Sequence, residues 1–314
     1  MPELMGAIGR LIGGATFAGA AALAYATLVE RTHFTLREET IPVLPDGADP
    51  LRILHISDLH MAPWQRAKQD WVRALAALKP DLVVDTGDNL GHARGIDGIR
   101  PALDAFEGVP GVYVWGSNDY FGPQLKNPLR YFGAAHGTPV PHTPIDREGL
   151  KRYLDGLGWI DLDNTATTLE IRGLSIEFFG TDDAHRDYDR LDIVSGAIDD
   201  MRDEESHAPD LSIGVTHAPY QRVLDSFVTH EADVILAGHT HGGQLCVPGY
   251  GALVTNCDIP REQVKGLSVW RHARRSAWLH VSAGLGTSIY APARFACPPE
   301  ATLITLMPRN AGSA

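Results

Sequence analysis

Short apolar runs, each followed at once by polar residues, recur along the chain and predict buried strands. Each run holds about five apolar residues, the length of a strand that is covered on both faces. Residues 66–78 place apolar side chains at helical spacing between two of these runs, so strands and helices alternate. The five runs lie within residues 51–57, 82–89, 111–119, 211–219 and 232–238.

Three further segments have recognisable patterns. Residues 166–180 predict a hairpin around Gly173, residues 190–206 a charged helix, and residues 220–229 a helix that opens after Pro219. Alternating strands and helices of this kind predict a protein of the α/β class.

Polar side chains with the chemistry of metal ligands follow the five runs. In α/β sheets, ligands bind at the carboxyl ends of the strands. Carboxylate, imidazole and amide groups together suit a divalent ion such as manganese, iron or zinc. One such loop alone would equally be a turn or a helix cap, but five in series favour a shared site. The residues are Asp58 and His60, Asp88 and Asn89, Asn118, His217, and His239 with His241.

These motifs resemble the calcineurin-like metallophosphoesterase superfamily in their order. The resemblance covers about residues 51–306 and rests on DLH, GDN, a degenerate GNHD, a single histidine and GHTH. A narrower resemblance, in GHTHGGQ, AGLGTS and RFACPPEATLITL, is to a branch of membrane-associated phosphohydrolases with an N-terminal membrane segment. The resemblance implies a four-layer αββα sandwich over residues 51–310, in which two mixed sheets are flanked by helices (class α/β, α+β).

The same resemblance implies two divalent metal ions. Asp58, His60 and His241 would hold one, His217, His239 and an amide oxygen of the third loop the other, and Asp88 would bridge both. A hydroxide between the ions would attack phosphorus. The catalytic residues implied are Asp58, Asp88, Asn118 and His239, with Asn89 orienting a ligand. His55, which lies within a strand, is expected to be a packed core histidine.

The third loop departs from the family pattern. Where the family has Gly-Asn-His-Asp, this chain has Gly116-Ser117-Asn118-Asp119. Serine is a poor metal ligand, so we expect a small backbone adjustment that lets Asn118 coordinate, with direct coordination by Ser117 as the alternative. Either way no imidazole remains to protonate the leaving group, a contribution typically worth roughly 100- to 10,000-fold. Tyr120, His92, His136 and His142 are the nearest other proton donors in the sequence.

Residues 120–145 have no periodicity and are rich in proline and aromatic residues. A segment of this length without regular structure is usually functional. We expect a lid or insertion over the substrate, using Tyr120, Arg130 or their neighbours, and a passive surface excursion is the alternative.

The N-terminus forms a separate element. Residues 11–29 carry no charge and as a helix would span about 28 Å, close to the thickness of a hydrocarbon core. A single-pass transmembrane anchor over residues 1–30 is favoured over a cleaved signal peptide, and the side of the membrane stays open. Residues 31–50, with several prolines, are expected to form a linker.

Composition limits the function further. A net charge of −12 argues against a nucleic-acid groove, which requires clustered Lys and Arg. The three cysteines form no CxxC pair and predict neither a disulfide framework nor a cysteine zinc site. We therefore expect a membrane-associated phosphoesterase acting on a diester or pyrophosphate, including a lipid-linked or nucleotide-lipid substrate. The alternatives are a phosphomonoesterase or nuclease with the same site, and a metal-binding membrane protein with little turnover.

Overall fold

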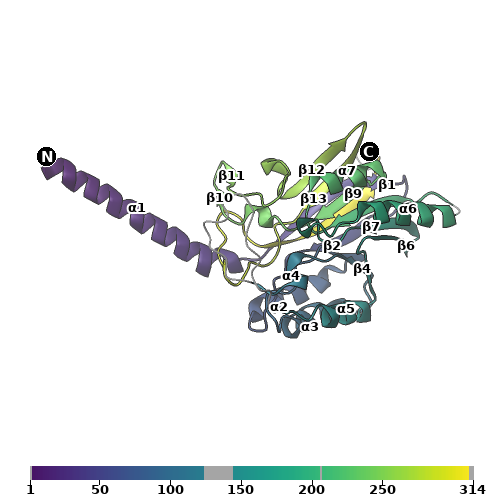
Figure 1. The fold of residues 1–314 in the computed structure, drawn as a ribbon, viewed down its shortest axis with the longest axis horizontal. Coiled ribbons are helices and arrows are strands. Elements are labelled where there is room, and N and C mark those ends of the chain that lie inside the picture. Colours follow the sequence, from purple (N-terminus) through teal and green to yellow (C-terminus); the bar gives the residue numbers. More distant parts are fainter. Residues whose placement is uncertain (1, 124–143, 206, 311–314) are drawn as a thin grey trace.

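Two six-stranded sheets form the centre of the molecule in the computed structural model, which describes residues 2–123, 144–205 and 207–310 (Figure 1). The first sheet has the order β1-β14-β2-β3-β4-β5. All neighbouring strands in it run parallel except β14 and β2. Its strands are β1 (Thr35–Leu44), β2 (Leu51–Ile56), β3 (Leu82–Asp85), β4 (Gly111–Tyr113), β5 (Trp159–Asp161) and β14 (Glu300–Pro308).

The second sheet has the order β12-β13-β9-β8-β7-β6 and is also mixed. Its four central strands are parallel, and an antiparallel strand closes each edge. A short ribbon of β10 (Cys246–Val247) and β11 (Gly251–Ala252) lies outside both sheets. The sheet strands are β6 (Thr165–Ile171), β7 (Leu174–Gly180), β8 (Leu211–Thr216), β9 (Val234–Ala237), β12 (Gly266–His272) and β13 (Arg275–Val281).

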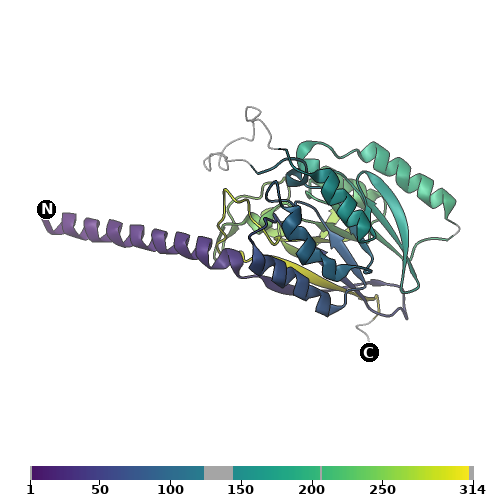
Figure 2. The same ribbon diagram turned by 90° about the horizontal axis from the view of Figure 1, so that it is seen from below.

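Three hydrophobic clusters separate four layers. The central cluster joins side chains of both sheets, such as Ile53 and Val84 from the first and Ile213 and Leu236 from the second. A second cluster packs the outer face of the first sheet on α2 (Arg66–Ala74), α3 (Ile96–Leu103) and α5 (Arg147–Gly156), which cover the near face in Figure 2. A third packs the second sheet on α6 (Leu191–Glu204) and α7 (Gln221–Thr229). The expected two mixed sheets flanked by helices are confirmed.

The strands, the hairpin and the helices predicted from periodicity are all present, but the expected linker is wrong in part. Residues 35–44 form β1, which pairs with β14 along its whole length, from Thr35 opposite Glu300 to Leu44 opposite Pro308. Ile41, Val43 and Leu44 are buried in the central cluster. Because β1 is an edge strand, Pro42 is compatible with it, although prolines there suggest a linker from the sequence alone.

The N-terminal segment forms α1 (Pro2–Leu28), which projects from the body of the molecule in both ribbon views (Figures 1 and 2). Within the described ranges, no helix is long and apolar enough to cross a membrane. The transmembrane helix expected over residues 11–29 is thus not supported. The segment carries no charge, but it consists mainly of glycine and alanine, which add little apolar surface. Its mean hydropathy is therefore lower than the absence of charge suggests.

The last turn of α1 is attached to the body. Arg294 N donates to Ala26 O at 3.1 Å, the rings of Tyr25 and Phe295 meet edge to face, and the Cys297 amide donates to the buried Glu30 carboxylate at 2.5 Å. The end of the helix and the residues that follow it therefore pack on residues 294–297, the loop that precedes β14.

Candidate metal centre

Five of the predicted ligands have left-handed backbone conformations. Their φ angles are 50° for Asp58, 39° for His60, 56° for Asp88, 68° for His239 and 51° for His241. Residues other than glycine adopt such angles rarely and at a cost of roughly 1–3 kcal/mol each, and they cluster at functional sites. Here the loops turn sharply at the carboxyl ends of β2, β3 and β9, which directs these side chains toward one place.

The side chains of the first half of this centre, Asp58, His60 and His241, lie close enough to share one ion. Asp58 Oδ1 is 3.5 Å from His241 Nε2 and 4.0 Å from His60 Nε2, and the two imidazole nitrogens are 3.2 Å apart. Asp58 is fully buried, and its Oδ1 accepts no hydrogen bond in the described structure. A buried carboxylate oxygen with two imidazole nitrogens around it fits a divalent cation.

The second half is formed by Asp88, His217 and His239. Asp58, Asp88 and His217 make a second three-residue group that could hold an ion, so Asp58 belongs to both groups. His239 lies outside these groups, but its Nδ1 is 3.2 Å from His217 Nε2. The residues present therefore fit two metal ions.

Asp88 lies between the two halves. Its Oδ2 is 3.5 Å from His60 Nε2, and its Oδ1 is 3.6 Å from His217 Nε2. One carboxylate oxygen thus faces each half, which is the arrangement that a bridging ligand requires.

Close packing brings the loops together at two glycines. A Cβ on Gly116 would lie 2.3 Å from Asp88 Oδ1, and one on Gly238 would lie 1.9 Å from Ser57 Oγ. Any other residue at these positions would displace the loop that carries Asp88 or Asp58.

The charges of the centre shift several pKa values. Burial alone would lower the pKa of His217, but Asp88 and Asp58 outweigh it and raise that pKa to about 9. Burial would raise the pKa of Asp88, but His217 and His60 hold it below its ordinary value. Burial lowers the pKa of His60 to about 4 and raises that of Asp58 to about 6. Opposite shifts in neighbouring groups are characteristic of functional sites.

The third loop shows where Ser117 and Asn118 point. Asn118 donates to Asp88 twice, from its backbone N to Oδ1 at 2.7 Å and from Nδ2 to Oδ2 at 2.6 Å. The Ser117 hydroxyl instead donates to the carboxylate of Asp183. Of these two third-loop residues, Asn118 therefore has its side chain at Asp88 and Ser117 has its side chain at Asp183, which favours Asn118 over Ser117 as the ligand. Both residues lie in the short helix α4 (Ser117–Tyr120).

Other predicted residues have different surroundings. The Tyr120 hydroxyl donates to both oxygens of Asp182 at 2.7 Å, which makes it a poor proton donor for a substrate. The backbone N of Asn89 donates to the buried Asp119, and its ligand-orienting role stays a prediction. His55 is fully buried between His280 and Thr86, so the expected core histidine is confirmed. Arg130, His136, His142 and most of the 120–145 segment lie outside the described residues.

Three residues of the site were missed from the sequence. The His185 ring lies 4.4 Å from that of His239, measured between centroids. Arg186 Nε donates to Ser117 Oγ at 3.2 Å, and Arg294 Nη2 is 3.2 Å from His241 Nδ1. The first two follow β7, whose carboxyl end meets the same edge as β8, and that position was the available signal. Arg294 is fully buried, and although it opens the RFACPPEATLITL motif, that motif did not point to a contact with His241.

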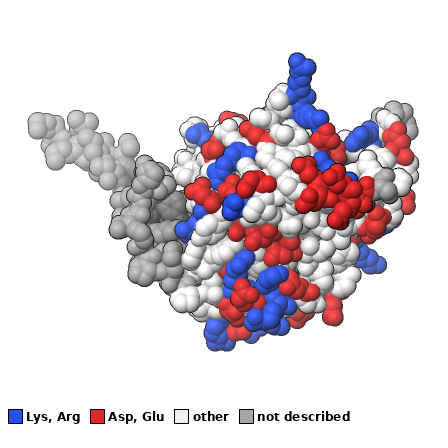
Figure 3. Space-filling model, turned by 45° about the vertical axis from the view of Figure 1, so that its right-hand side comes forward, with Lys and Arg blue, Asp and Glu red and all other residues white. Residues whose placement is uncertain are grey.

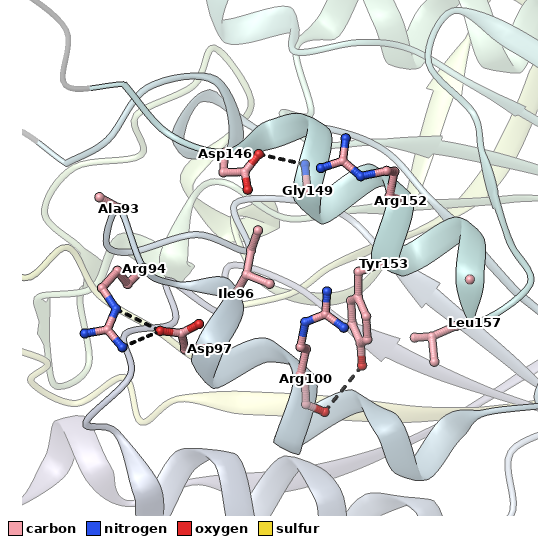
Figure 4. A pocket seen from close by; sticks show the side chains of 11 residues that line it. Ala93, Arg94, Ile96, Asp97, Arg100, Asp146, Gly149, Arg152, Tyr153 and Leu157 are labelled. Atoms are coloured by element: carbon pink, nitrogen blue, oxygen red, sulfur yellow. Dashed lines mark hydrogen bonds and ion pairs between the residues drawn. The ribbon is translucent and has the colours of Figure 1, made fainter.

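A hollow of about 610 Å³ between α3 and α5 contains none of these residues (Figure 4). Its Arg94 pairs with Asp97, and its Asp146 caps α5 by accepting from Gly149 N. On the face drawn in Figure 3, acidic patches lie between separate groups of Lys and Arg, and no continuous basic groove crosses that face.

The calcineurin-like phosphoesterase family matches residues 51–243. The chain belongs to this family and is a metallophosphoesterase, a hydrolase of phosphate esters whose Asp and His clusters could bind metal. Dependence on two metal ions is a property of the family.

Similar proteins come from several bacteria. An uncharacterized metallophosphoesterase of Bacillus subtilis, YkuE, is 27% identical over 98% of this chain and 97% of its own length. The phosphodiesterase YaeI of Escherichia coli is 25% identical over 93% of this chain and 96% of its own length. Among solved structures, the NAD nucleotidase of Haemophilus influenzae has a TM-score of 0.46 and 12% identity, covering 76% of this chain and 51% of that one.

Proposed function

We propose that the protein hydrolyses a phosphodiester or pyrophosphate bond with two divalent ions, of manganese, iron or zinc. The observation that carries this proposal is the convergence of Asp58, His60, His217 and His241 around Asp88, whose two oxygens face the two halves. At such a site, divalent ions supply a nucleophilic water at neutral pH and neutralise charge at phosphorus.

The chain's own residues place and orient these ligands. Asp58 would serve the first half, and His217 and His239 the second, with Asp88 between them. His217 Nδ1 lies 2.7 Å from Thr86 O, a contact that places its proton on Nδ1 and leaves Nε2 free toward Asp88. Asn118 is held by two hydrogen bonds to Asp88. Its backbone N donates to Oδ1, which faces His217, and its side-chain Nδ2 donates to Oδ2, which faces His60, so the side-chain amide lies on the His60 side of Asp88.

The choice of a diester or pyrophosphate rests on the third loop. Asn118 occupies the position at which the family has an imidazole, and a side-chain amide cannot donate a proton to a leaving oxygen. Substrates whose leaving group departs as a stable anion, such as aryl or nucleotidyl phosphates, suit this site better than alkyl esters. The relative named as a phosphodiesterase supports the same choice.

Membrane association and a lipid-linked substrate are part of the proposal. Phe17, Leu23 and Leu28 on α1 are 77%, 62% and 73% exposed, so the projecting helix presents apolar side chains to its surroundings. Flotation of the full chain with phospholipid vesicles, compared with a Phe17→Ser, Leu23→Ser, Leu28→Ser variant, tests this part. Equal recovery of both proteins below the vesicles would contradict it.

The central experiment compares substrates. The full chain loaded with manganese is assayed against bis-aryl phosphate, mono-aryl phosphate and a nucleotide pyrophosphate, with metal content measured in parallel. We expect the diester and the pyrophosphate to be preferred. A preference for the monoester would favour the phosphomonoesterase alternative. Absence of turnover on all three with two bound ions would identify a metal-binding protein instead.

A further inference from the structure

The turn after β7 brings to the metal centre two side chains that the proposed mechanism does not use. His185 and Arg186 lie in a single helical turn, Ala184–Arg186. The His185 ring packs on His239 with centroids 4.4 Å apart, and Arg186 Nε donates to Ser117 Oγ at 3.2 Å. Ser117 immediately precedes Asn118, which is bonded to Asp88. Arg186 thus stands beside the second half of the centre.

Arg186 is held by several contacts. Ser117 Oγ accepts the hydrogen bond from Arg186 Nε, and its own hydroxyl donates a hydrogen bond to Asp183. Asp183 is fully buried and also accepts from the backbone N of His185 at 2.9 Å, which anchors the turn. The guanidinium carbon of Arg186 lies 5.0 Å from the centroid of the Phe121 ring. These contacts engage Nε and one face of the guanidinium.

The two terminal nitrogens of Arg186 remain available. Within the part of the chain that the structure describes, they donate no hydrogen bond, and no carboxylate forms an ion pair with Arg186. Neighbouring arginines differ: Arg147 pairs with Asp163, Arg190 with Asp192, and Arg222 with Asp189. Other half-buried arginines, such as Arg52 and Arg261, also lack an ion pair among the described residues, but Arg186 lies beside the metal centre.

We propose that Arg186 binds phosphoryl oxygens of the substrate through its terminal nitrogens, and that Ser117 is the positioning residue that holds it. This inference rests on the proposed function. Guanidinium matches phosphate by two parallel hydrogen bonds and keeps its charge at all physiological pH values. Such an arginine would stabilise charge on the phosphoryl group in a loop that lacks an imidazole acid. The serine that replaces the family's asparagine thereby acquires a role away from the metal.

The test uses Arg186→Gln in the full chain, with Arg190→Gln as the matched control. Arg190 is four residues further on and 55% exposed, so its replacement removes the same charge without touching the site. The binding of inorganic phosphate to the manganese-loaded protein is measured by calorimetry. We expect Arg186→Gln to raise the dissociation constant about tenfold or more, with two ions still bound. The kcat/KM for a bis-aryl phosphate should fall roughly 100-fold.

Four further variants separate positioning from folding. Ser117→Ala should weaken phosphate binding less than Arg186→Gln does, and Ser117→Thr, which keeps the hydroxyl, should restore it. Activity of Arg186→Ala should recover in part with millimolar guanidinium, an effect that a structural role would not produce. If Arg186→Gln does not fold, Arg186→Lys, which keeps the charge but loses the two-pronged geometry, should give the same direction of change.

The outcomes are distinct from those of the substrate assay. Unchanged phosphate affinity in a folded, two-metal Arg186→Gln protein would overturn the assignment of Arg186, whatever the substrate. A wild-type protein that binds phosphate through Arg186 but hydrolyses no ester would instead contradict the proposed function and leave this assignment in place.

Discussion

The two halves of the metal centre carry similar ligands, but their imidazoles have different neighbours. In the second half, His217 Nδ1 faces the carbonyl of Thr86 at 2.7 Å, and His239 Nε2 faces the carbonyl of Asn256 at 3.1 Å. A carbonyl acceptor fixes the proton on one nitrogen and leaves the other free for a metal. The Asn256 side-chain Nδ2 also lies 3.0 Å from Nε2, but because it is a donor, the Asn256 carbonyl is the group that accepts the Nε2 proton.

Among the described residues, the imidazoles of the first half have no such acceptor. His60 Nδ1 is buried without a hydrogen-bond partner there, and His241 Nδ1 faces the guanidinium of Arg294 at 3.2 Å. A cation at that position disfavours the tautomer in which Nε2 is free and reduces the electron density of the ring. Outer neighbours of this kind change metal affinity by about 10- to 100-fold. We expect the second half to bind its ion more tightly than the first, although both offer histidine and aspartate.

The largest effect should come from the residue that the halves share. Asp88→Asn removes one negative charge between them without changing the size of the side chain. We expect turnover to fall by about 1,000-fold or more, equivalent to about 4 kcal/mol of transition-state stabilisation. Metal analysis after dialysis should give one ion per chain or fewer. Two tightly bound ions with normal turnover would show that Asp88 does not join the halves.

Removing one ligand from each half should reveal their inequality. We expect metal titration of the unmodified protein to show two classes of site. His217→Ala should lower the affinity of the tighter site by roughly 100-fold, and His241→Ala should lower the affinity of the weaker site by a similar factor. Calorimetry in the presence of a competing chelator measures both. Equal affinities in the unmodified protein, or loss of the tight class in His241→Ala, would break the comparison.

The halves should also differ in pH dependence. Metal binding requires deprotonated ligands. The pKa of His217 is raised to about 9, so this histidine keeps its proton at neutral pH in the metal-free protein, and affinity of the second half should rise about tenfold per pH unit up to that value. In the first half the pKa is about 4 for His60 and about 6 for Asp58, so affinity should level off above about pH 6.

Proton release provides the measurement for this difference. Calorimetry at pH 7.5 in buffers of different ionisation enthalpy should show about one proton released by the tighter ion and almost none by the weaker one. The same proton count for both ions would contradict the assignment of His217 to the tight half.

The smallest effect tests the link from the first half to the N-terminal segment. The buried Glu30 accepts from Cys297 N, and the same loop holds Arg294 against His241. Glu30→Ala should lower the free energy of unfolding by about 1–3 kcal/mol and weaken the first ion a few-fold, with the second unchanged. Glu30→Gln, which keeps an acceptor oxygen, is the control and should lose less. Equal weakening of both ions would show that the loop does not act through one half.

The sequence by itself determined the strands and helices of the body and the residues near the metal centre. Apolar runs of strand length, such as 82–85 and 234–237, predict strands that are buried on both faces, and both strands are buried along their whole length. The ordered motifs led to Asp58, Asp88, His217 and His241 because ligand chemistry resides in side-chain type and in position at strand ends.

Only the tertiary structure decided what each of these side chains contacts. The segment expected to be a linker forms β1 by pairing with β14, which lies about 260 residues further along the chain. Local sequence patterns contain no information about a partner at that separation. Ser117 turned toward Asp183 and Asn118 toward Asp88 because of helix α4 and the turn after β7. Arg186 reaches the site from a segment without a motif. Arg294 belongs to the RFACPPEATLITL motif, but only the fold places it against His241. A hydrogen bond depends on distances of a few tenths of an ångström, which are set by the packing of both sheets together and not by any local stretch of sequence.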